Sequence, residues 1–239
     1  MKVLVIVPHP DDETLCCAGT IMKFIEKGDK VKVIIVTDGR YGAPSEELRG
    51  TEELVRIRKE EALKVFKLLG VEDYEFLGFE DSRVSQKSKE VEERLAEILE
   101  KYKPDIVFAP SPLDSHPDHS EIGKIVKKIF PNAYFYVVWV DSGEKVKKLV
   151  KNEKVKRMLL KLFPFLPSLY SRLFWKYPKE GGEIVKFDIR DKKEKKMRAL
   201  EEYKSQIKDL KKFLSLNKFV EDYEVFYKLK KEGSLTRQK

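Results

Sequence analysis

Short apolar runs recur through the first 140 residues, and a helical pattern follows most of them. The first run, 3–7, contains only Val, Leu and Ile, which is typical of a strand buried on both faces of a sheet. The pattern predicts strands near 3–7, 31–37, 74–77, 105–109 and 134–140, and helices near 14–27, 51–69, 90–102 and 118–130. Strands that alternate with helices through short joins predict a right-handed, doubly wound parallel sheet. We therefore expect residues 1–140 to form a Rossmann-like, three-layer α/β fold with a mostly parallel sheet.

The regular alternation ends after residue 140. We expect 141–239 to add a cap or lid and C-terminal elements to one domain, 1–239. In 158–177, aromatic and basic side chains surround two prolines, which disfavour a single long helix. Three interpretations of this segment stay open, namely a lid, an oligomer contact or a patch that docks on a membrane. Further along, the pattern predicts a strand at 183–189, a long amphipathic helix at 192–214 and a last strand at 224–229.

All three histidines of the chain lie where a predicted strand gives way to a helix. His9 begins the sequence HPDDE, and His116 and His119 lie in the sequence SHPDH at 115–119. In an open α/β sheet these corners meet at the carboxyl edge of the strands, where ligands bind, and the first and fourth strands flank the usual switch point. A dinucleotide-binding loop would carry glycines there, whereas imidazoles and carboxylates attract a divalent cation. The pairing of the two sequences predicts a metal site.

Length and charge restrict the class of protein. A chain of 239 residues can bury the core of one large α/β domain. No segment has the roughly 18 uncharged apolar residues of a spanning helix. Cys16 and Cys17 are adjacent and cannot form an ordinary disulfide bridge, so we expect them to be buried thiols of a cytoplasmic protein. Residues 1–150 carry 24 basic and 28 acidic side chains, whereas 151–239 carry 25 and 13. Because no nucleic-acid motif accompanies the basic part, we expect no nucleic acid partner; peripheral contact with anionic membrane through 151–177 stays open.

The two histidine sequences resemble those of the LmbE-like zinc N-deacetylases, a superfamily that includes N-acetylglucosaminyl-phosphatidylinositol de-N-acetylase. The resemblance extends over residues 2–130 and returns at 196–206. It implies hydrolysis of the N-acetyl amide of an N-acetylglucosamine-type amino sugar, with release of acetate and with one zinc ion per chain. It also implies a small-molecule amino-sugar substrate and a homo-oligomer, because relatives are often trimers or hexamers.

The resemblance implies His9, Asp12 and His119 as the metal ligands. Two neutral imidazoles and one carboxylate would leave a coordination position open for water. Asp11 is implied as the general base that takes a proton from the attacking water. From the residues alone, Asp11 could instead be the N-cap of the following helix. Glu13 is expected to serve the helix N-terminus rather than the reaction.

The second histidine sequence divides two roles between its histidines. The resemblance implies that His116 stabilises the oxyanion or donates a proton, in a form that can be cationic, with Asp118 as the residue that orients it. Some relatives have a tyrosine two residues before the first of these histidines, where this chain has Asp114. A tyrosine contribution to the oxyanion site is therefore not expected here.

Two further positions match substrate contacts of the family. Arg58 corresponds to an arginine that reaches the substrate, and Asp81 to an aspartate that bonds sugar hydroxyls, although either could be an ordinary ion pair. Other functions also stay open, namely hydrolysis of a different amide or ester, or non-catalytic binding of a metal or sugar. Asp11 distinguishes them, because a protein that only binds metal needs no free carboxylate beside three ligands.

Overall fold

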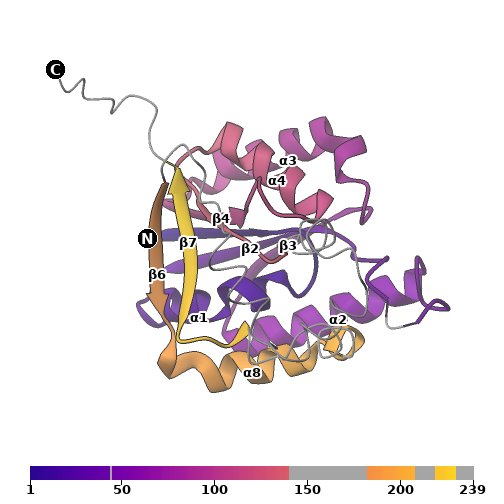
Figure 1. Ribbon diagram of the computed structural model, residues 1–239, viewed down its shortest axis with the longest axis horizontal. Helices are drawn as coiled ribbons and strands as arrows, with labels where there is room; N and C mark the ends of the chain where they lie inside the picture. Colours follow the sequence, from indigo (N-terminus) through magenta and orange to yellow (C-terminus); the bar gives the residue numbers. More distant parts are fainter. Residues whose placement is uncertain (44, 140–181, 208–218, 230–239) are drawn as a thin grey trace, which may run out of the picture.

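The computed structural model describes residues 1–43, 45–139, 182–207 and 219–229. In this part of the chain a seven-stranded sheet lies between two layers of helices (Figure 1). From edge to edge the strands are β3 (Asp73–Phe79), β2 (Lys30–Thr37), β1 (Lys2–Val7), β4 (Ile106–Pro110), β5 (Tyr134–Tyr136), β7 (Tyr223–Leu229) and β6 (Gly182–Asp188). Strands β1 to β5 are parallel, and β7 is antiparallel to both of its neighbours. The predicted α/β fold with a mostly parallel sheet is confirmed.

Helices cover both faces of the sheet (Figure 1). On one face lie α1 (Asp12–Glu26), α2 (Glu52–Leu69) and α8 (Lys193–Glu202), and on the other lie α3 (Ser88–Tyr102) and α4 (Pro117–Ile129). Two short 3-10 helices, η1 (Val84–Lys87) and η2 (Arg190–Lys192), precede α3 and α8. The ends of α2 illustrate the local signals, because the Thr51 hydroxyl accepts the Leu54 N–H and Gly70 ends the helix at φ +86°.

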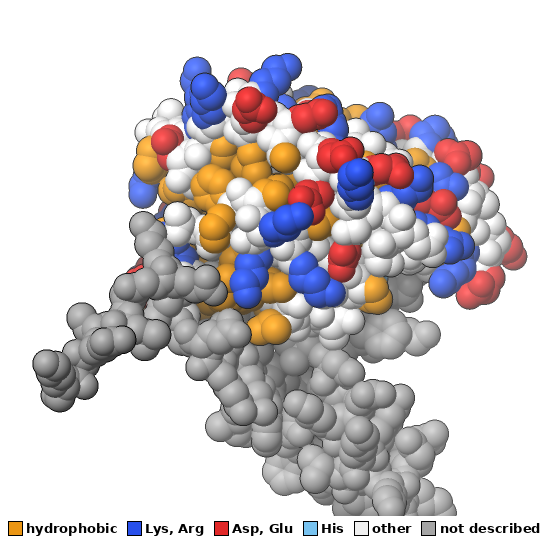
Figure 2. Space-filling model, turned by 90° about the horizontal axis from the view of Figure 1, so that it is seen from above, with side chains coloured by type: hydrophobic (Ala, Val, Ile, Leu, Met, Phe, Trp, Pro, Cys, Tyr) orange, Lys and Arg blue, Asp and Glu red, His pale blue; other side chains and the backbone are white. Residues whose placement is uncertain are grey.

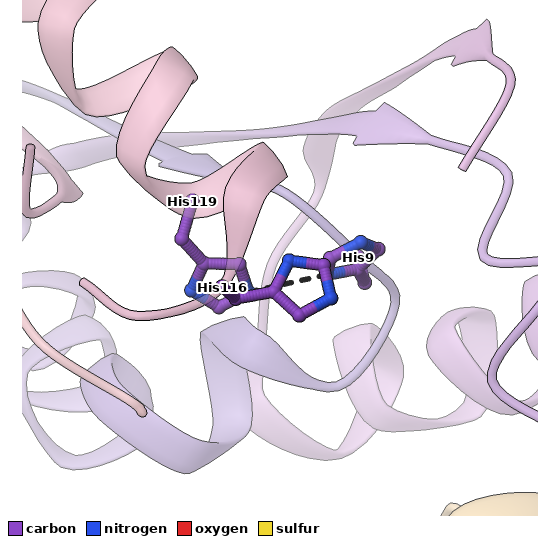
Figure 3. A group of neighbouring side chains, drawn as sticks. All are labelled: His9, His116 and His119. Atoms are coloured by element: carbon purple, nitrogen blue, oxygen red, sulfur yellow. Dashed lines mark hydrogen bonds between the residues drawn. The ribbon is translucent and has the colours of Figure 1, made fainter. Parts of the chain in front are cut away.

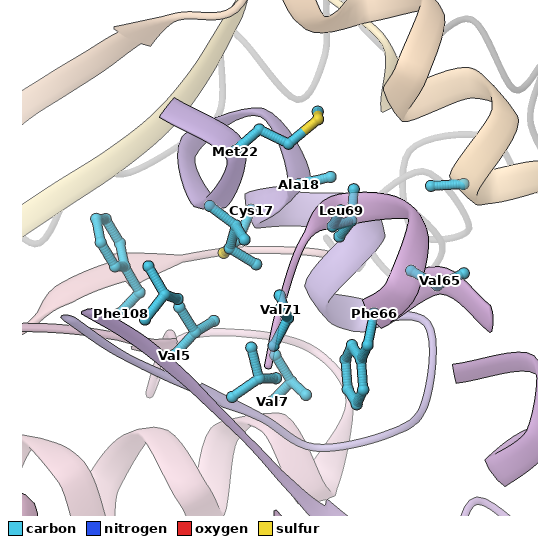
Figure 4. Packing of buried hydrophobic residues seen from close by; sticks show 14 of the residues in the cluster. Val5, Val7, Cys17, Ala18, Met22, Val65, Phe66, Leu69, Val71 and Phe108 are labelled. Carbon is cyan, nitrogen blue, oxygen red and sulfur yellow. The ribbon is translucent and has the colours of Figure 1, made fainter. Parts of the chain in front are cut away.

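Strand β1 contributes to both cores because its side chains alternate between the faces. Val5 and Val7 pack in the same cluster as Cys17 of α1 and Phe66 of α2 (Figure 4). Ile6 instead belongs to the cluster beneath α3 and α4. All of these side chains are fully buried. Because helices cover β1 on both faces, both sets of its alternating side chains have to be apolar, as they are from Val3 to Val7.

The C-terminal elements are joined to α1 by a buried ion pair. The Lys196 ammonium of α8 donates to Glu224 of β7 at 2.6 Å and to the Leu15 carbonyl at 3.0 Å. The same carboxylate accepts the N–H groups of Gly19 and Thr20 in α1, at 2.9 and 2.7 Å. Both charged side chains are almost fully buried, so each depends on the other for compensation.

The prediction of one long helix at 192–214 is wrong within the described residues. Helix α8 ends at Glu202, Tyr203 has a non-helical backbone with φ −78° and ψ 63°, and helical backbone resumes at 204–207. The interruption coincides with the buried side chain of Tyr203, whose hydroxyl donates to Glu13. Strands β6 and β7 each begin one residue before the predicted position, and residues 208–214 lie outside the described part.

Strand β5 is shorter than the predicted 134–140. It ends at Tyr136, and the N–H groups of Val138 and Trp139 donate to the Asp114 carboxylate instead of to a strand. The predicted cap, including 151–177, lies outside the described residues, so its role stays a prediction.

The face formed by α3 and α4 carries basic and acidic side chains that are interspersed (Figure 2). Ion pairs such as Arg94–Glu97 and Lys128–Glu92 connect them. This face therefore lacks the uniform basic patch of a nucleic-acid-binding surface. Among the helices that the structure describes, none combines the length and the apolar character needed to cross a membrane.

Candidate metal centre

The loops that carry the histidines meet at the switch point of the sheet. β1 and β4 are neighbours, and the loops that leave their carboxyl ends lead directly into α1 and α4. As a result His9, His116 and His119 converge (Figure 3), with ring centroids between 4.8 and 5.2 Å apart. The structure thus brings together three residues that lie up to 110 positions apart in the sequence.

The three predicted metal ligands each present one atom to a common point. His9 Nδ1, Asp12 Oδ2 and His119 Nε2 form a triangle in which every edge measures 3.2 Å. In a tetrahedron the distance between ligands is about 1.6 times the bond length, so zinc bonds of about 2.0 Å need an edge of about 3.3 Å. The triangle therefore fits one face of a zinc coordination tetrahedron, and water or substrate could take the fourth position.

The electrostatics of this triangle favour a bound cation. Two imidazole nitrogens that face each other at 3.2 Å repel unless a proton or a metal ion lies between them. Burial alone would raise the pKa of Asp12, but His119 and His9 hold that pKa well below its usual range. Asp12 is therefore ionised, and it also accepts the His9 backbone N–H at 3.0 Å.

The second ring nitrogen of His9 faces two more carboxylates. His9 Nε2 lies 3.2 Å from Asp81 Oδ1 and 3.3 Å from Asp118 Oδ2. Burial alone would lower the pKa of His9, but hydrogen bonds with Asp118, Asp12 and Asp81 raise it. A carboxylate behind a ligating histidine fixes the orientation of the ring and increases its basicity.

The predicted pairing of Asp118 with His116 is not what the structure shows. Besides His9, the Asp118 carboxylate accepts the backbone N–H groups of Ser82 and Val84 at 2.7 and 3.4 Å. His116 Nδ1 is buried without a hydrogen-bond partner among the described residues. Because the backbone donors direct Asp118 towards His9, this aspartate orients a predicted metal ligand instead of His116.

His116 is also not cationic in this environment. Burial, followed by the positive charges of His9 and His119, lowers the pKa of His116 to about 4. The ring is therefore neutral at pH 7, contrary to the expectation of a cationic group. A neutral imidazole can still donate one N–H to a developing oxyanion.

Asp114 is a site residue that the sequence analysis did not identify. Its side chain is completely buried, and its Oδ2 lies 3.4 Å from His119 Nδ1, although without the alignment of a hydrogen bond. The same carboxylate accepts the backbone N–H of His116 at 2.9 Å, as well as the two N–H groups beyond β5. Burial alone would lower the pKa of His119, but Asp12 and Asp114 raise it to about 9. The Asp-x-His spacing, typical of an Asx turn, was the signal that could have revealed this residue.

Asp11 lies beside the triangle and has an unusual backbone. Its φ is +126° and its ψ is −29°, a strained conformation for a residue with a side chain. Asp11 occupies the N-cap position of α1, as the alternative interpretation expects, but its side chain makes no capping hydrogen bond. Its Oδ2 lies 3.3 Å from Arg58 Nη2. Burial raises the pKa of Asp11 to about 7, although the charge of Arg58 opposes the shift.

The two predicted substrate contacts are both buried. Arg58 is 2% exposed, and its guanidinium donates to the carbonyls of Gly39 and Pro10 at 2.7 and 2.5 Å. Asp81 is 4% exposed and accepts the Tyr41 N–H at 3.0 Å. Neither is a surface ion pair, and a contact of either residue with substrate stays a prediction. What the structure shows is that Arg58 supports Asp11 and its loop, and that Asp81 supports His9.

Other groups of potential ligands occur within the described residues. In a first group, His9, His116 and His119 each present one ring nitrogen, and these nitrogens lie within 4.8 Å of one another. In a second group, one ring nitrogen of His9 and one carboxylate oxygen each of Asp81 and Asp118 lie equally close together. Asp12, Asp81 and Asp118 all accept backbone N–H groups, so these bonds do not distinguish the groups. The triangle with Asp12 is the better match because its edges agree with tetrahedral zinc and its ligands are two imidazoles and one carboxylate.

Comparison with known proteins agrees with the resemblance of the two histidine sequences. Residues 4–130 match the family model PIG-L: GlcNAc-PI de-N-acetylase. The matched residues include both histidine sequences and make up more than half of the chain. The chain is 36% identical over 125 residues to diacetylchitobiose deacetylase of Thermococcus kodakarensis, a match of 51% of this chain and 46% of that protein. It is 29% identical over 128 residues to a probable N-acetyl-α-D-glucosaminyl L-malate deacetylase 2 of Bacillus anthracis, matching 52% of this chain and 57% of that protein. The matched part thus spans about half the length of these curated relatives.

A solved structure extends the similarity beyond the matched sequence. The N,N'-diacetylchitobiose deacetylase from Pyrococcus horikoshii, complexed with its inhibitor MPG, aligns with a TM-score of 0.62 and 28% identity. The alignment covers 94% of this chain and 82% of that one. The similarity to deacetylases of N-acetylglucosamine-type substrates therefore includes the fold as well as the two histidine sequences.

Proposed function

We propose that this chain, which belongs to the PIG-L (GlcNAc-PI de-N-acetylase) family, hydrolyses the N-acetyl amide of an N-acetylglucosamine-type amino sugar. The observation that supports this most directly is the triangle of His9, Asp12 and His119 with Asp11 beside it. A divalent cation held by these three ligands, for which we propose zinc, would polarise the amide carbonyl and lower the pKa of water towards about 7.

The general base in this proposal is Asp11. Its carboxylate takes the proton of the water that attacks the carbonyl carbon, and the positive charge of Arg58 favours its ionised form. A pKa of about 7 suits this task, because the base is then partly ionised at neutral pH and becomes an acid after it accepts the proton. When the C–N bond breaks, the protonated Asp11 returns that proton to the departing amine, so that acetate and the free amine are released.

His116 has a different role in the same step. Its ring lies 4.8 and 4.9 Å from the rings of the two ligating histidines, at the edge of the triangle. As a neutral imidazole it donates an N–H to the oxyanion that forms on the carbonyl oxygen, and it does not compete with Asp11 for the proton. Asp81 and Asp118 hold His9, and Asp114 holds the loop before His119.

The experiment that tests the function is acetate release from N-acetylglucosamine, N,N'-diacetylchitobiose and an N-acetylglucosamine-linked lipid. Each substrate is assayed with metal-stripped and with zinc-restored protein. We expect zinc-dependent release that is lost in Asp11→Asn while the zinc content stays at one ion per chain. Asp105→Asn is the matched control, because the Asp105 carboxylate accepts the Lys2 N–H at the amino-terminal ends of β1 and β4, away from the histidines.

Two other results would change the proposal. Bound zinc without release from any of the three substrates would reject the amino-sugar assignment and favour another amide or ester. Release by Asp11→Asn at the wild-type rate would reject Asp11 as the base. Peripheral contact with anionic membrane through 151–177 and assembly into a trimer or hexamer remain proposals, and they require vesicle sedimentation and a mass measurement.

A further inference from the structure

Tyr203 connects the C-terminal part of the chain to the loop of the candidate base. It lies just beyond α8, is fully buried, and its hydroxyl donates to Glu13 Oε1 at 2.5 Å, across 190 residues of sequence. Glu13 is also fully buried, and the same oxygen accepts the Thr14 hydroxyl at 2.7 Å. Two hydroxyl donors therefore hold this carboxylate in one orientation.

The other oxygen of Glu13 is directed at the strained residue. Glu13 Oε2 accepts the backbone N–H of Asp11 at 3.2 Å. At φ +126° a residue with a β-carbon leaves the favoured regions of backbone conformation, so surrounding contacts must maintain it. On the other side of the residue, the Asp11 carbonyl accepts the N–H groups of Thr14 and Leu15 at 2.9 Å each, and this fixes the peptide to α1.

Tyr203 is itself fixed by the residues that follow it. Ser205 donates its N–H and its hydroxyl to the Glu61 carboxylate at 2.8 and 2.6 Å. The Gln206 side-chain amide donates to the Gly42 carbonyl at 2.6 Å. These bonds join the segment after α8 to α2 and to the loop after β2, and they hold in place the backbone next to Tyr203.

We infer that Tyr203 and Glu13 are positioning residues that hold Asp11 in its positive-φ conformation and so direct its carboxylate towards the reacting water. Neither residue touches the substrate in this scheme. The statement about the water rests on the proposed function, whereas the statement about the backbone of Asp11 does not. The C-terminal segment then takes part in the reaction through the Glu13 side chain.

The test compares Tyr203→Phe, Glu13→Ala and the double variant with the wild-type protein. For each variant we would measure kcat, KM and zinc content, and determine the Asp11 backbone from a crystal structure. We expect kcat to fall by about 10- to 100-fold, the range for a reacting group displaced by about an ångström. Zinc stays at one ion per chain, KM changes by less than about 2-fold, and φ of Asp11 becomes negative.

Two variants control for loss of folding. Tyr102→Phe removes a hydroxyl that donates to the Lys30 carbonyl at 3.0 Å. Lys30 is the first residue of β2, at the end of the strand away from the histidines, so this variant should keep the wild-type kcat. Glu13→Gln keeps an acceptor for the Asp11 N–H and should retain more activity than Glu13→Ala. Because Tyr203 acts through Glu13, the double variant should be no slower than Glu13→Ala alone.

Three outcomes would overturn the inference. The first is an Asp11 φ that stays near +126° in Tyr203→Phe and in Glu13→Ala, and the second is a double variant in which the two losses of kcat multiply. The third is a loss of kcat that only follows a loss of bound zinc. If the wild-type protein releases no acetate from any substrate, the proposed function fails, and the φ of Asp11 in the variants still decides whether these residues position it.

Discussion

Replacing Arg58 with methionine removes a positive charge that lies 3.3 Å from the Asp11 carboxylate. Arg58 stabilises the ionised form of Asp11, so its loss raises the pKa of Asp11 above about 7. A general base has to be ionised to accept a proton, and activity therefore rises with pH as the base ionises. We expect the acidic limb of the pH profile of kcat/KM to move to higher pH in Arg58→Met.

The size of the shift follows from the distance between the two charges. At 3.3 Å and an effective dielectric constant of about 20, two unit charges interact by about 5 kcal/mol, an upper bound of about three to four pKa units. Measured pKa values of aspartates beside an arginine are lower than usual by about 1–3 units. We therefore expect the limb to move up by about 2 units, which reduces kcat/KM at pH 7 by about 50-fold.

The assay is the pH profile of kcat/KM for zinc-loaded protein, with zinc content measured at each pH. Arg58→Lys keeps the charge and should keep the limb near the wild-type position, whereas it loses the fork that bonds two carbonyls. Arg56→Met is the matched control, since Arg56 lies in the same helix but is exposed and pairs with Glu60. An acidic limb in Arg58→Met that stays within about 0.3 unit of wild type, with zinc bound, would refute the electrostatic role of Arg58.

Two further predictions concern the metal and the C-terminal elements. In metal-free protein the pKa of His119 is about 9, because Asp12 and Asp114 outweigh the effect of burial, so zinc has to displace a proton. The pKa of His9 is raised as well, so zinc displaces protons from both histidines. Zinc affinity, measured by competition with a chelator, should therefore rise by about 10- to 100-fold per pH unit up to pH 9, and a plateau above pH 7 would contradict this. Lys196→Met leaves the buried Glu224 carboxylate without its cation and should lower the free energy of unfolding in urea by about 3–5 kcal/mol. The double variant Lys196→Met/Glu224→Gln should recover part of that loss, and an unchanged midpoint in Lys196→Met would show that the pair is not needed.

The sequence by itself determined the parallel part of the sheet and the position of the candidate metal centre. Uniformly apolar runs such as 3–7, which alternate with helical patterns, are typical of strands covered on both faces, and parallel strands have their carboxyl ends at one edge. With three histidines in the whole chain, placed after two such runs, their convergence followed from the strand order alone. These inferences need the period of hydrophobic residues, which is a local property of the chain, and the rule that parallel strands joined by helices have their carboxyl ends at one edge.

The directional contacts around the histidines were decided only by the tertiary structure. Asp118 faces His9 instead of its sequence neighbour His116 because two backbone N–H groups after β3 direct its carboxylate. Asp114 lies beside His119, and its carboxylate also accepts the Val138 N–H just beyond β5. Each of these contacts depends on how closely two loops that are far apart in the sequence approach each other in the folded chain.

The same reason explains the residues around Asp11. Its positive φ, the burial of Arg58 beneath its loop and the reach of Tyr203 to Glu13 all result from how α1, α2 and α8 pack together. A pattern of hydrophobic residues predicts which face of a helix is buried, but it does not specify which polar atoms meet inside. The sequence therefore determined which residues gather at the site, and the packing of the helices decided which of them act on one another.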